Sequence, residues 1–222
     1  MQAYKTGAAK ARALERNRSV ETRHANGQVH QRYRLVDGRY EGRYETFYSN
    51  GNPAALVLYD RGLKQEETLY FEEGQVKQVS RFNQKIESSR IQFYQNGKTK
   101  LEWNRVEADG VYQKYRFKKY FSNGQLATEG ATYKPGWDSS YQDYLDGEVR
   151  RYRDNGELLA LEFYEKGKRA GTWKYVSDSF DVEDTYRQGK LAARVVLDGQ
   201  SKRKLKRYEY MPDGSVKSEH GY

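Results

Sequence analysis

The stretch of sequence that decides the fold reads Glu45-Thr-Phe-Tyr-Ser-Asn-Gly-Asn-Pro-Ala-Ala-Leu-Val-Leu-Tyr-Asp-Arg-Gly62. Two aromatic residues precede Asn50-Gly51, and a half-apolar run then leads to a second turn at Arg61-Gly62. Both central residues of a type I′ turn have positive φ, which Asn and Gly tolerate best. The stretch therefore predicts a β-hairpin with a two-residue type I′ turn at Asn50-Gly51.

The expected turn also sets which residues of the hairpin face one another. Counting outward from Asn50-Gly51, Phe47 should face Ala54 and Tyr44 should face Val57. Strand side chains alternate between the two faces, so consecutive aromatic residues point to opposite sides, which suits a single twisted sheet. One face should carry Tyr40, Tyr44, Tyr48, Val57 and Tyr59, and the other Glu41, Arg43, Glu45, Phe47, Leu56 and Leu58.

The same pattern recurs along the chain. The turns that we call tips end at glycines 27, 51, 74, 97, 124, 156 and 214, and the last gap is wide enough for a missing tip near Ser177-Asp178-Ser179. A second class, the return turns, alternates with the tips at Asp37-Gly38, Arg61-Gly62, Asp109-Gly110, Pro135-Gly136, Lys166-Gly167 and Gln188-Gly189. Alternating turns of this kind predict an all-β protein, an elongated antiparallel meander of tandem β-hairpin repeats.

The composition is unusual for a folded domain. Leu, Ile, Val and Phe make up less than a fifth of the 222 residues, and the net charge is +9. These values alone would favour disorder, but 21 Tyr at regular spacing supply apolar area to a sheet. The absence of cysteine excludes disulfides, thiolate zinc sites and thiol catalysis. No run of residues is apolar and long enough to span a membrane.

The first residues differ from the rest. Residues 1–19 lack the repeat, and we expect a basic leader that is a short helix or disordered. Residues 20–222 should form the repeat domain, with about eight units. Residues 1–40 hold nine Lys/Arg and three Asp/Glu, so the basic excess is concentrated there. This bias indicates a solvated tether more than a nucleic-acid-binding segment.

No arrangement of residues in the sequence indicates catalysis. His24, His30 and His220 are not spaced as a metal site, no serine motif occupies a strand–turn–helix elbow, and the glycines are turn glycines. We therefore expect no catalytic, cofactor-binding or metal-binding residues and no enzyme activity. The basic run 202–207 reads as a strand with Leu205 inward, rather than as a phosphate-binding patch.

Two segments break the repeat period, and we expect the partner-binding site there. They are residues 134–146 and 177–184, and both combine acidic residues with large aromatic ones. Aromatic anchors beside charges suit a protein interface, and acidic side chains could also occupy a basic cleft of the partner. The alternative is a solvated loop that covers the sheet. The residues expected to bind the partner are Trp137, Asp138, Tyr141, Asp143, Tyr144, Phe180 and Asp181.

The repeated pattern of Gly, an aromatic pair, Asn-Gly, an apolar residue and a second aromatic residue before Gly resembles the MORN-repeat variant. The copies at 42–62, 93–110, 120–136 and 152–171 carry it best. The resemblance implies an array of β-hairpins that binds a partner. In bacteria, such proteins look like immunity or antitoxin partners of secreted toxins. Because both insertions depart from the family period, no binding residue can be transferred onto them.

Three functions follow as hypotheses. The first is a bacterial immunity or antitoxin protein that binds and blocks a cognate toxin. The second is a scaffold or membrane-surface adaptor that binds anionic lipid through basic residues. The third, a nucleic-acid binder, is less favoured. We expect a periplasmic protein if Met1 replaces a removed signal sequence, and a cytoplasmic one otherwise.

Overall fold

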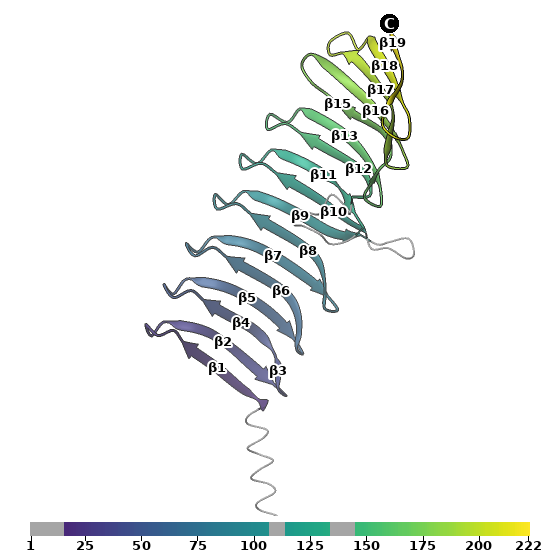
Figure 1. Ribbon diagram of the computed structural model, residues 1–222. Coiled ribbons are helices and arrows are strands. Elements are labelled where there is room, and N and C mark those ends of the chain that lie inside the picture. Colours follow the sequence, from purple (N-terminus) through teal and green to yellow (C-terminus); the bar gives the residue numbers. More distant parts are fainter. Residues whose placement is uncertain (1–15, 107–113, 134–144) are drawn as a thin grey trace, which may run out of the picture. The chain divides into compact units, whose positions relative to one another are not determined.

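The computed structural model describes residues 16–106, 114–133 and 145–222 (Figure 1). Its 19 strands belong to one antiparallel sheet and contain more than half of the chain, which confirms the predicted all-β meander. None of the described residues forms a helix of the length and apolarity that crossing a membrane requires. The expected leader lies largely outside the described residues, and the first strand begins at Arg18.

The chain divides into two compact units, Met1–Lys100 and Leu101–Tyr222. The strands of the first unit are β1 (Arg18–Arg23), β2 (Val29–Val36), β3 (Arg39–Tyr40), β4 (Gly42–Phe47), β5 (Pro53–Asp60), β6 (Leu63–Tyr70), β7 (Val76–Asn83) and β8 (Ile86–Phe93). β9 (Thr99–Val106) contains the boundary between the units. The second unit continues with β10 (Lys114–Tyr120), β11 (Leu126–Thr132), β12 (Gly147–Tyr152), β13 (Leu158–Glu165), β14 (Lys168–Arg169), β15 (Gly171–Tyr175), β16 (Phe180–Arg187), β17 (Lys190–Asp198), β18 (Lys204–Tyr210) and β19 (Val216–Gly221).

The tips are turns, as predicted, but they are not of type I′. Gly51 has a φ of 87°, while Asn50 is absent from the residues with positive φ. The amide of Gly51 donates to the carbonyl of Tyr48 (3.0 Å), and the amide of Tyr48 donates to Asn52 (2.8 Å). This is a type I turn followed by a bulge glycine. Asn50 keeps negative φ because its side-chain oxygen accepts the amide of Asn52 (2.9 Å).

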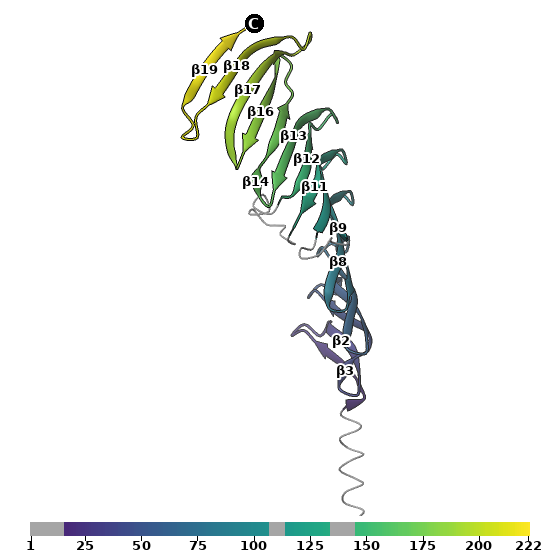
Figure 2. The same cartoon turned by 90° about the vertical axis from the view of Figure 1, so that its right-hand side faces the viewer.

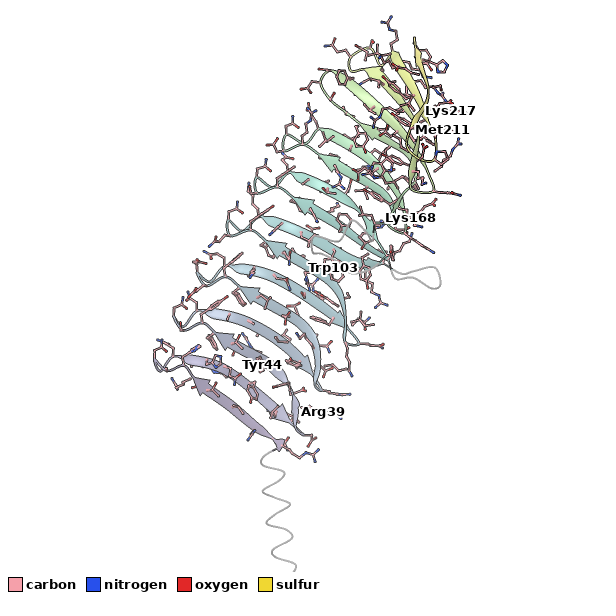
Figure 3. All side chains as sticks on the ribbon, in the orientation of Figure 1. Arg39, Tyr44, Trp103, Lys168, Met211 and Lys217 are labelled. Carbon is pink, nitrogen blue, oxygen red and sulfur yellow. The ribbon has the colours of Figure 1, made fainter. Side chains whose placement is uncertain are left out.

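The different turn shifts the strand register near the tip. Phe47 pairs with Pro53 and not with Ala54, so that prediction is wrong. A bulge between Thr46 and Phe47 then adds one residue to the partner strand, and Tyr44 pairs with Val57 as expected. The predicted faces therefore hold beyond the bulge. The rings of Tyr40, Tyr44 and Tyr59 pack together, with centroids of Tyr40 and Tyr59 5.0 Å apart; Figure 3 labels Tyr44.

The type I′ turns are the return turns. At Arg61-Gly62 both residues have positive φ, 49° and 81°, and Asp60 pairs directly with Leu63. The same geometry occurs at Asp37-Gly38, Lys166-Gly167 and Gln188-Gly189. Gln84-Lys85 is a further turn of this kind that the glycine pattern missed. The expected turns at Asp109-Gly110 and Pro135-Gly136 lie outside the described residues.

The segment 177–184 is mostly a strand, not an insertion. β15 ends at Tyr175 and β16 begins at Phe180, so residues 176–179 connect the two strands where the missing tip was expected. The prediction of a loop through residue 184 is wrong because residues 180–187 pair along their whole length with β17. The basic run is a strand from Lys204 onward, with Leu205 half-buried, whereas Lys202 and Arg203 precede β18.

Three glycines with positive φ interrupt the strands in the same way. They are Gly42, Gly147 and Gly171, with φ of 73°, 88° and 61°. Each lies in a bulge, and the residue two positions later points into the sheet's more buried face: Tyr44, Val149 and Trp173. The bulge therefore changes the direction of the chain at the start of β4, β12 and β15.

Successive hairpins are also tied together through their return turns. The amide of Gly62 donates to Tyr40 (2.9 Å), and that of Arg61 donates to the Glu41 carboxylate (2.7 Å). Gly167 and Lys166 bind Leu145 and Asp146 in the same arrangement, at 2.8 and 3.1 Å. Figure 1 shows the described return turns and the tips up to that between β12 and β13 on opposite sides of the strands of each unit. The tip at Gly214 instead lies beside the return turn at Gln188-Gly189, since the Lys190 ammonium donates to the Pro212 carbonyl (2.8 Å).

The best-buried large apolar side chains form one cluster in the second unit. Trp103, Trp173, Leu145 and Val149 are each at most 2% exposed. The remaining members of the cluster are Leu101, Tyr115, Phe117, Tyr164 and Tyr186. Aromatic rings thus replace the missing aliphatic core, as the composition predicts. In Figure 2 the strands from β16 to β19 of this unit follow one another side by side.

Candidate functional site

The face of the second unit opposite the buried cluster carries a continuous row of mostly charged side chains. Paired residues on neighbouring strands share a face, so the partners of one residue can be followed from strand to strand. We call this face the charged face. From β9 to β19 its central row is Glu102, Lys118, Glu129, Arg150, Leu161, Lys174, Glu183, Val195, Arg207 and His220.

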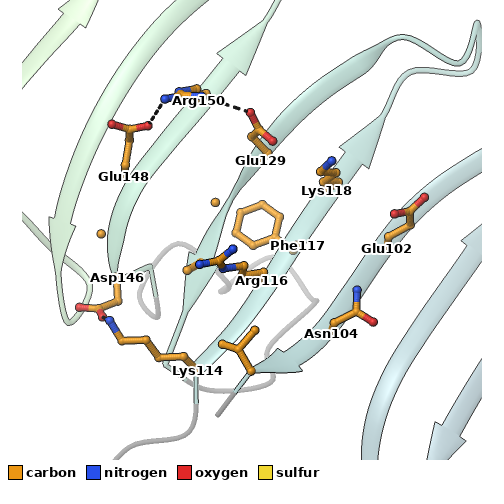
Figure 4. A pocket seen from close by; sticks show the side chains of 14 residues that line it. Glu102, Asn104, Lys114, Arg116, Phe117, Lys118, Glu129, Asp146, Glu148 and Arg150 are labelled. Carbon is orange, nitrogen blue, oxygen red and sulfur yellow. Dashed lines mark ion pairs between the residues drawn. The ribbon is translucent and has the colours of Figure 1, made fainter. Parts of the chain in front are cut away.

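A groove of about 840 Å³ opens on this face over β9 to β12 (Figure 4). Its walls carry both signs of charge, from Lys114, Arg116, Lys118 and Arg150 on one hand and Glu102, Glu129, Asp146 and Glu148 on the other. Phe117 also contributes to its lining although the ring is only 2% exposed. The groove is therefore polar and open, and its shape is that of a surface trough.

The groove exists because the strands part around Gly130. β11 and β12 pair at Glu129 and Arg150, and the next contact is the bridge from Thr132 to Leu145, displaced by the bulge at Gly147. A Cβ on Gly130 would lie 2.8 Å from the Val149 side chain. Only glycine fits there without a shift of the buried Val149, which is 0% exposed.

The acidic residues of the groove are already engaged. Asp146 accepts from the Lys114 ammonium at 2.8 Å. Burial alone would raise the pKa of Asp146, but hydrogen bonds from Lys114 and from the Lys166 amide outweigh it, and the pKa is lowered. Arg150 binds Glu148 at 2.6 Å and lies 3.8 Å from Glu129.

A second set of carboxylates is buried beneath the charged face and is also neutralised. Asp184 is 1% exposed and receives two hydrogen bonds from Arg194, at 2.7 and 2.8 Å. Glu162 receives one from Arg151 (2.8 Å) and one from the Tyr164 hydroxyl (3.0 Å). Such pairs satisfy buried charge and leave no free base for proton transfer at these two positions. The described residues hold no group of three metal-ligating side chains.

An apolar stripe lies beside the groove on the same face. Leu159, Leu161 and Phe163 alternate along β13, and Leu159 and Phe163 are 39% and 42% exposed. Phe163 packs over Gly171, whose missing Cβ would lie 3.6 Å from the Phe163 Cβ. The stripe is bordered by Arg150 on β12 and Lys174 on β15, which pair with Leu161. An apolar centre with a charged rim is the usual build of a protein interface.

The structure places only two of the residues expected to bind a partner. Phe180, at the start of β16, is 52% exposed, and Asp181 pairs with Lys202 at 2.7 Å. Adjacent strand residues point to opposite faces, so these two side chains cannot serve one flat contact. The other five, Trp137, Asp138, Tyr141, Asp143 and Tyr144, lie outside the described residues.

The sequence contains patterns that indicate the groove and the stripe, but the repeat pattern is more regular and draws attention away from them. Lys114, Arg116 and Lys118 alternate along one strand, as do Leu159, Leu161 and Phe163. Gly130 is an isolated glycine within a strand-like run, which can mark a bulge or a close backbone approach. The juxtaposition of these features across strands could not be read from spacing, because it depends on the bulge at Gly147.

Comparisons with known proteins agree with the repeat pattern. The model of the family described as MORN repeat variant matches residues 40–61, 116–134 and 145–166. The first and third of these regions begin two residues before Gly42 and Gly147, and end at Arg61 and Lys166, the first residues of two return turns. No curated protein matches the chain.

Solved structures give only remote likenesses. A crystal structure of TcdB2-TccC3 is 9% identical over 92% of this chain, with a TM-score of 0.18. The Photorhabdus luminescens Tc holotoxin pore is 10% identical over 91% of this chain, with a TM-score of 0.19. The chain spans 19% and 18% of those chains. Values this low bear on neither fold nor function.

Proposed function

The chain is a MORN-repeat variant protein, and from this premise we propose that it is a non-enzymatic module that binds another protein. The observation that carries the proposal is the apolar stripe beside the charged groove, in which Leu159 and Phe163 are exposed and Leu161 is half-buried. Exposed leucine and phenylalanine side chains in line on one strand gain free energy when a partner removes them from water.

The mixed charge of this face supports a protein partner over a polyanion. The central row alternates in sign from Glu102 to Arg150, and the rim of the stripe includes both Glu148 and Lys174. A nucleic acid or an anionic membrane would meet the carboxylates as well as the cations. A protein surface can present the complementary sign at each position.

The finer proposal is that the partner is a cognate toxin that this protein binds and blocks, as an immunity or antitoxin protein in a bacterium. It rests on the resemblance of the repeat pattern to proteins of that kind. The stripe offers apolar contacts and the groove offers charged ones. A toxin that covered both would have part of its own surface buried against the sheet and thereby blocked. A scaffold on anionic lipid remains the competing function, and the experiment distinguishes it.

The test replaces the stripe. The double variant L159R/L161R puts two cations where apolar contacts are proposed, and L58R, which changes a leucine of β5 that is 36% exposed, is the control. The tagged proteins are used to capture a partner from the source cells, which is then identified, purified and titrated. We expect L159R/L161R to lose binding and protection from the partner's toxicity while L58R keeps both. Binding to anionic vesicles in place of a protein would overturn the proposal.

A further inference from the structure

Strand β10 presents three cations in line on the floor of the groove. Lys114, Arg116 and Lys118 occupy alternate positions, so they share a face and follow one another at about 7 Å. Figure 4 shows their side chains along β10, with Glu102 and Asn104 on β9 to one side and Glu129 on β11 to the other. The side chains on one face of an extended peptide are also two residues apart.

Two of these three cations form no ion pair with the carboxylates of the groove. Asp146 takes Lys114, Arg150 binds both Glu148 and Glu129, and the Tyr120 hydroxyl shares a hydrogen bond with Glu102. Within the described residues, no ion pair or side-chain hydrogen bond involves Arg116 or Lys118. The groove therefore keeps two exposed cations whose charge the protein does not neutralise by direct contact.

Small neighbours leave Arg116 accessible, whereas Lys118 lies between Glu102 and Glu129. Arg116 pairs across the strands with Asn104 on one side and Ala131 on the other. The next residue of β11 is Gly130, which has no side chain at all. No long side chain from a paired position can lie over Arg116, so a ligand can approach the guanidinium from the open side of the groove.

We propose that the groove binds an extended acidic segment of the partner protein, with carboxylates at alternate positions that pair with Arg116 and Lys118. The proposal rests on the proposed function, and names the chemistry that the partner brings to the groove. A carboxylate can take two hydrogen bonds from a guanidinium, which fixes the segment's direction. The apolar stripe then receives the residues that follow the acidic segment.

A uniform polyanion fits this groove less well than such a peptide. Glu102, Glu129, Asp146 and Glu148 surround the three cations, and a chain of phosphates or a lipid surface would place charge against all of them. A peptide with acidic residues at every second position, and neutral residues between, can match the cations and avoid the carboxylates. The arrangement of positive and negative side chains in the groove, more than its net charge, therefore determines which ligand binds.

The experiment measures the binding of two fluorescein-labelled peptides of the same composition by anisotropy. One alternates Glu with Thr, and the other has its Glu residues in one block. The variant R116Q/K118Q removes the two cations, and R34Q/K217Q removes two exposed cations that have no ion pair within the described residues. We expect the alternating peptide to bind the unaltered protein better than the block peptide, and R116Q/K118Q to weaken it about tenfold.

Equal binding of the two peptides, or equal loss in R34Q/K217Q, would overturn the proposal. So would single-stranded DNA or anionic vesicles binding more tightly than the alternating peptide through the same two cations. Titration of the identified partner distinguishes a failure of the groove proposal from a failure of the proposed function. If R116Q/K118Q binds that partner normally and L159R/L161R does not, the groove proposal fails while the proposed function stands.

Discussion

At the scale of single residues, the asparagine of three tips, Asn26, Asn50 and Asn123, has two functions. Its side-chain oxygen accepts the amide two residues on, as in Asn123 with Gln125 (2.9 Å), which holds the turn. Its side-chain amide donates to the carbonyl of the next tip, as in Asn123 with Asp154 (3.0 Å). Asp213, in the final described tip, makes only the first kind of contact, with Ser215 at 2.9 Å. An aspartate is sufficient where no further tip follows in the described chain.

Asn123→Asp should therefore destabilise the protein while leaving its own turn intact. The carboxylate keeps the acceptor for Gln125 but loses the donor to Asp154, at a cost of about 1 kcal/mol. Urea unfolding measures the change. Asp213→Asn is the matched control and should be neutral within a few tenths of a kcal/mol. Equal effects at both positions would contradict the role assigned to the contact between tips.

A buried tyrosine should make stability fall in alkali. Burial, together with the adjacent carboxylate of Glu162 and its hydrogen bond, raises the pKa of Tyr164 from 10.0 to about 12. The unfolded chain ionises first, so this contribution is complete below pH 10 and is lost as the pH rises towards 12. The melting temperature of Tyr164→Phe should decline less over that interval than that of the unaltered protein. Tyr222→Phe, at a residue 66% exposed, should leave the decline unchanged.

At the scale of strands and turns, the sequence predicted element order better than turn geometry. The turn pairs predicted an antiparallel meander, but not the connection at residues 199–203 between β17 and β18. The tip type was wrong because Asn50 binds Asn52 through its side chain and so retains negative φ. The error stayed local, since the added bulge residue restores the expected register by Tyr44 and Val57. Gln84-Lys85 was missed because neither residue is a glycine, although both have positive φ.

Truncation at the first hairpin tests where the repeat array begins. The sequence predicts that loss of residues 1–19 changes little, but the structure assigns contacts to the last four of them. Arg16 and Asn17 accept the amides of Gly38 and Asp37 at 2.8 and 2.9 Å, and β1 starts at Arg18. A chain that starts at Val20 should melt a few degrees below one that starts at Arg16, on the order of 2–4 °C per kcal/mol lost. Identical melting temperatures would contradict these contacts.

At the scale of the molecule, the repeat pattern predicted an all-β protein but not where a surface could bind. The sequence predicts the site where the repeat period is broken. Of those residues Phe180 and Asp181 belong to a regular strand, with the Asp181 carboxylate bound to Lys202. The groove and the stripe arise from regular strands whose side chains meet only through pairing and through the bulge at Gly147. The order of the strands in a meander can be inferred from sequence. A bulge, in contrast, changes which residues face one another across two strands without changing the spacing of the sequence pattern.

The most direct test of the protein-binding proposal is oxidative footprinting of the purified complex with its identified partner. Hydroxyl radicals modify exposed aromatic and leucine side chains, and the sites are read by mass spectrometry. We expect Phe163 and Leu159, 42% and 39% exposed in the free protein, to become protected in the complex. Ile86 and Leu63 of the first unit, 48% and 36% exposed, should react as before. Protection of Ile86 and Leu63 with Phe163 and Leu159 unchanged would contradict the account.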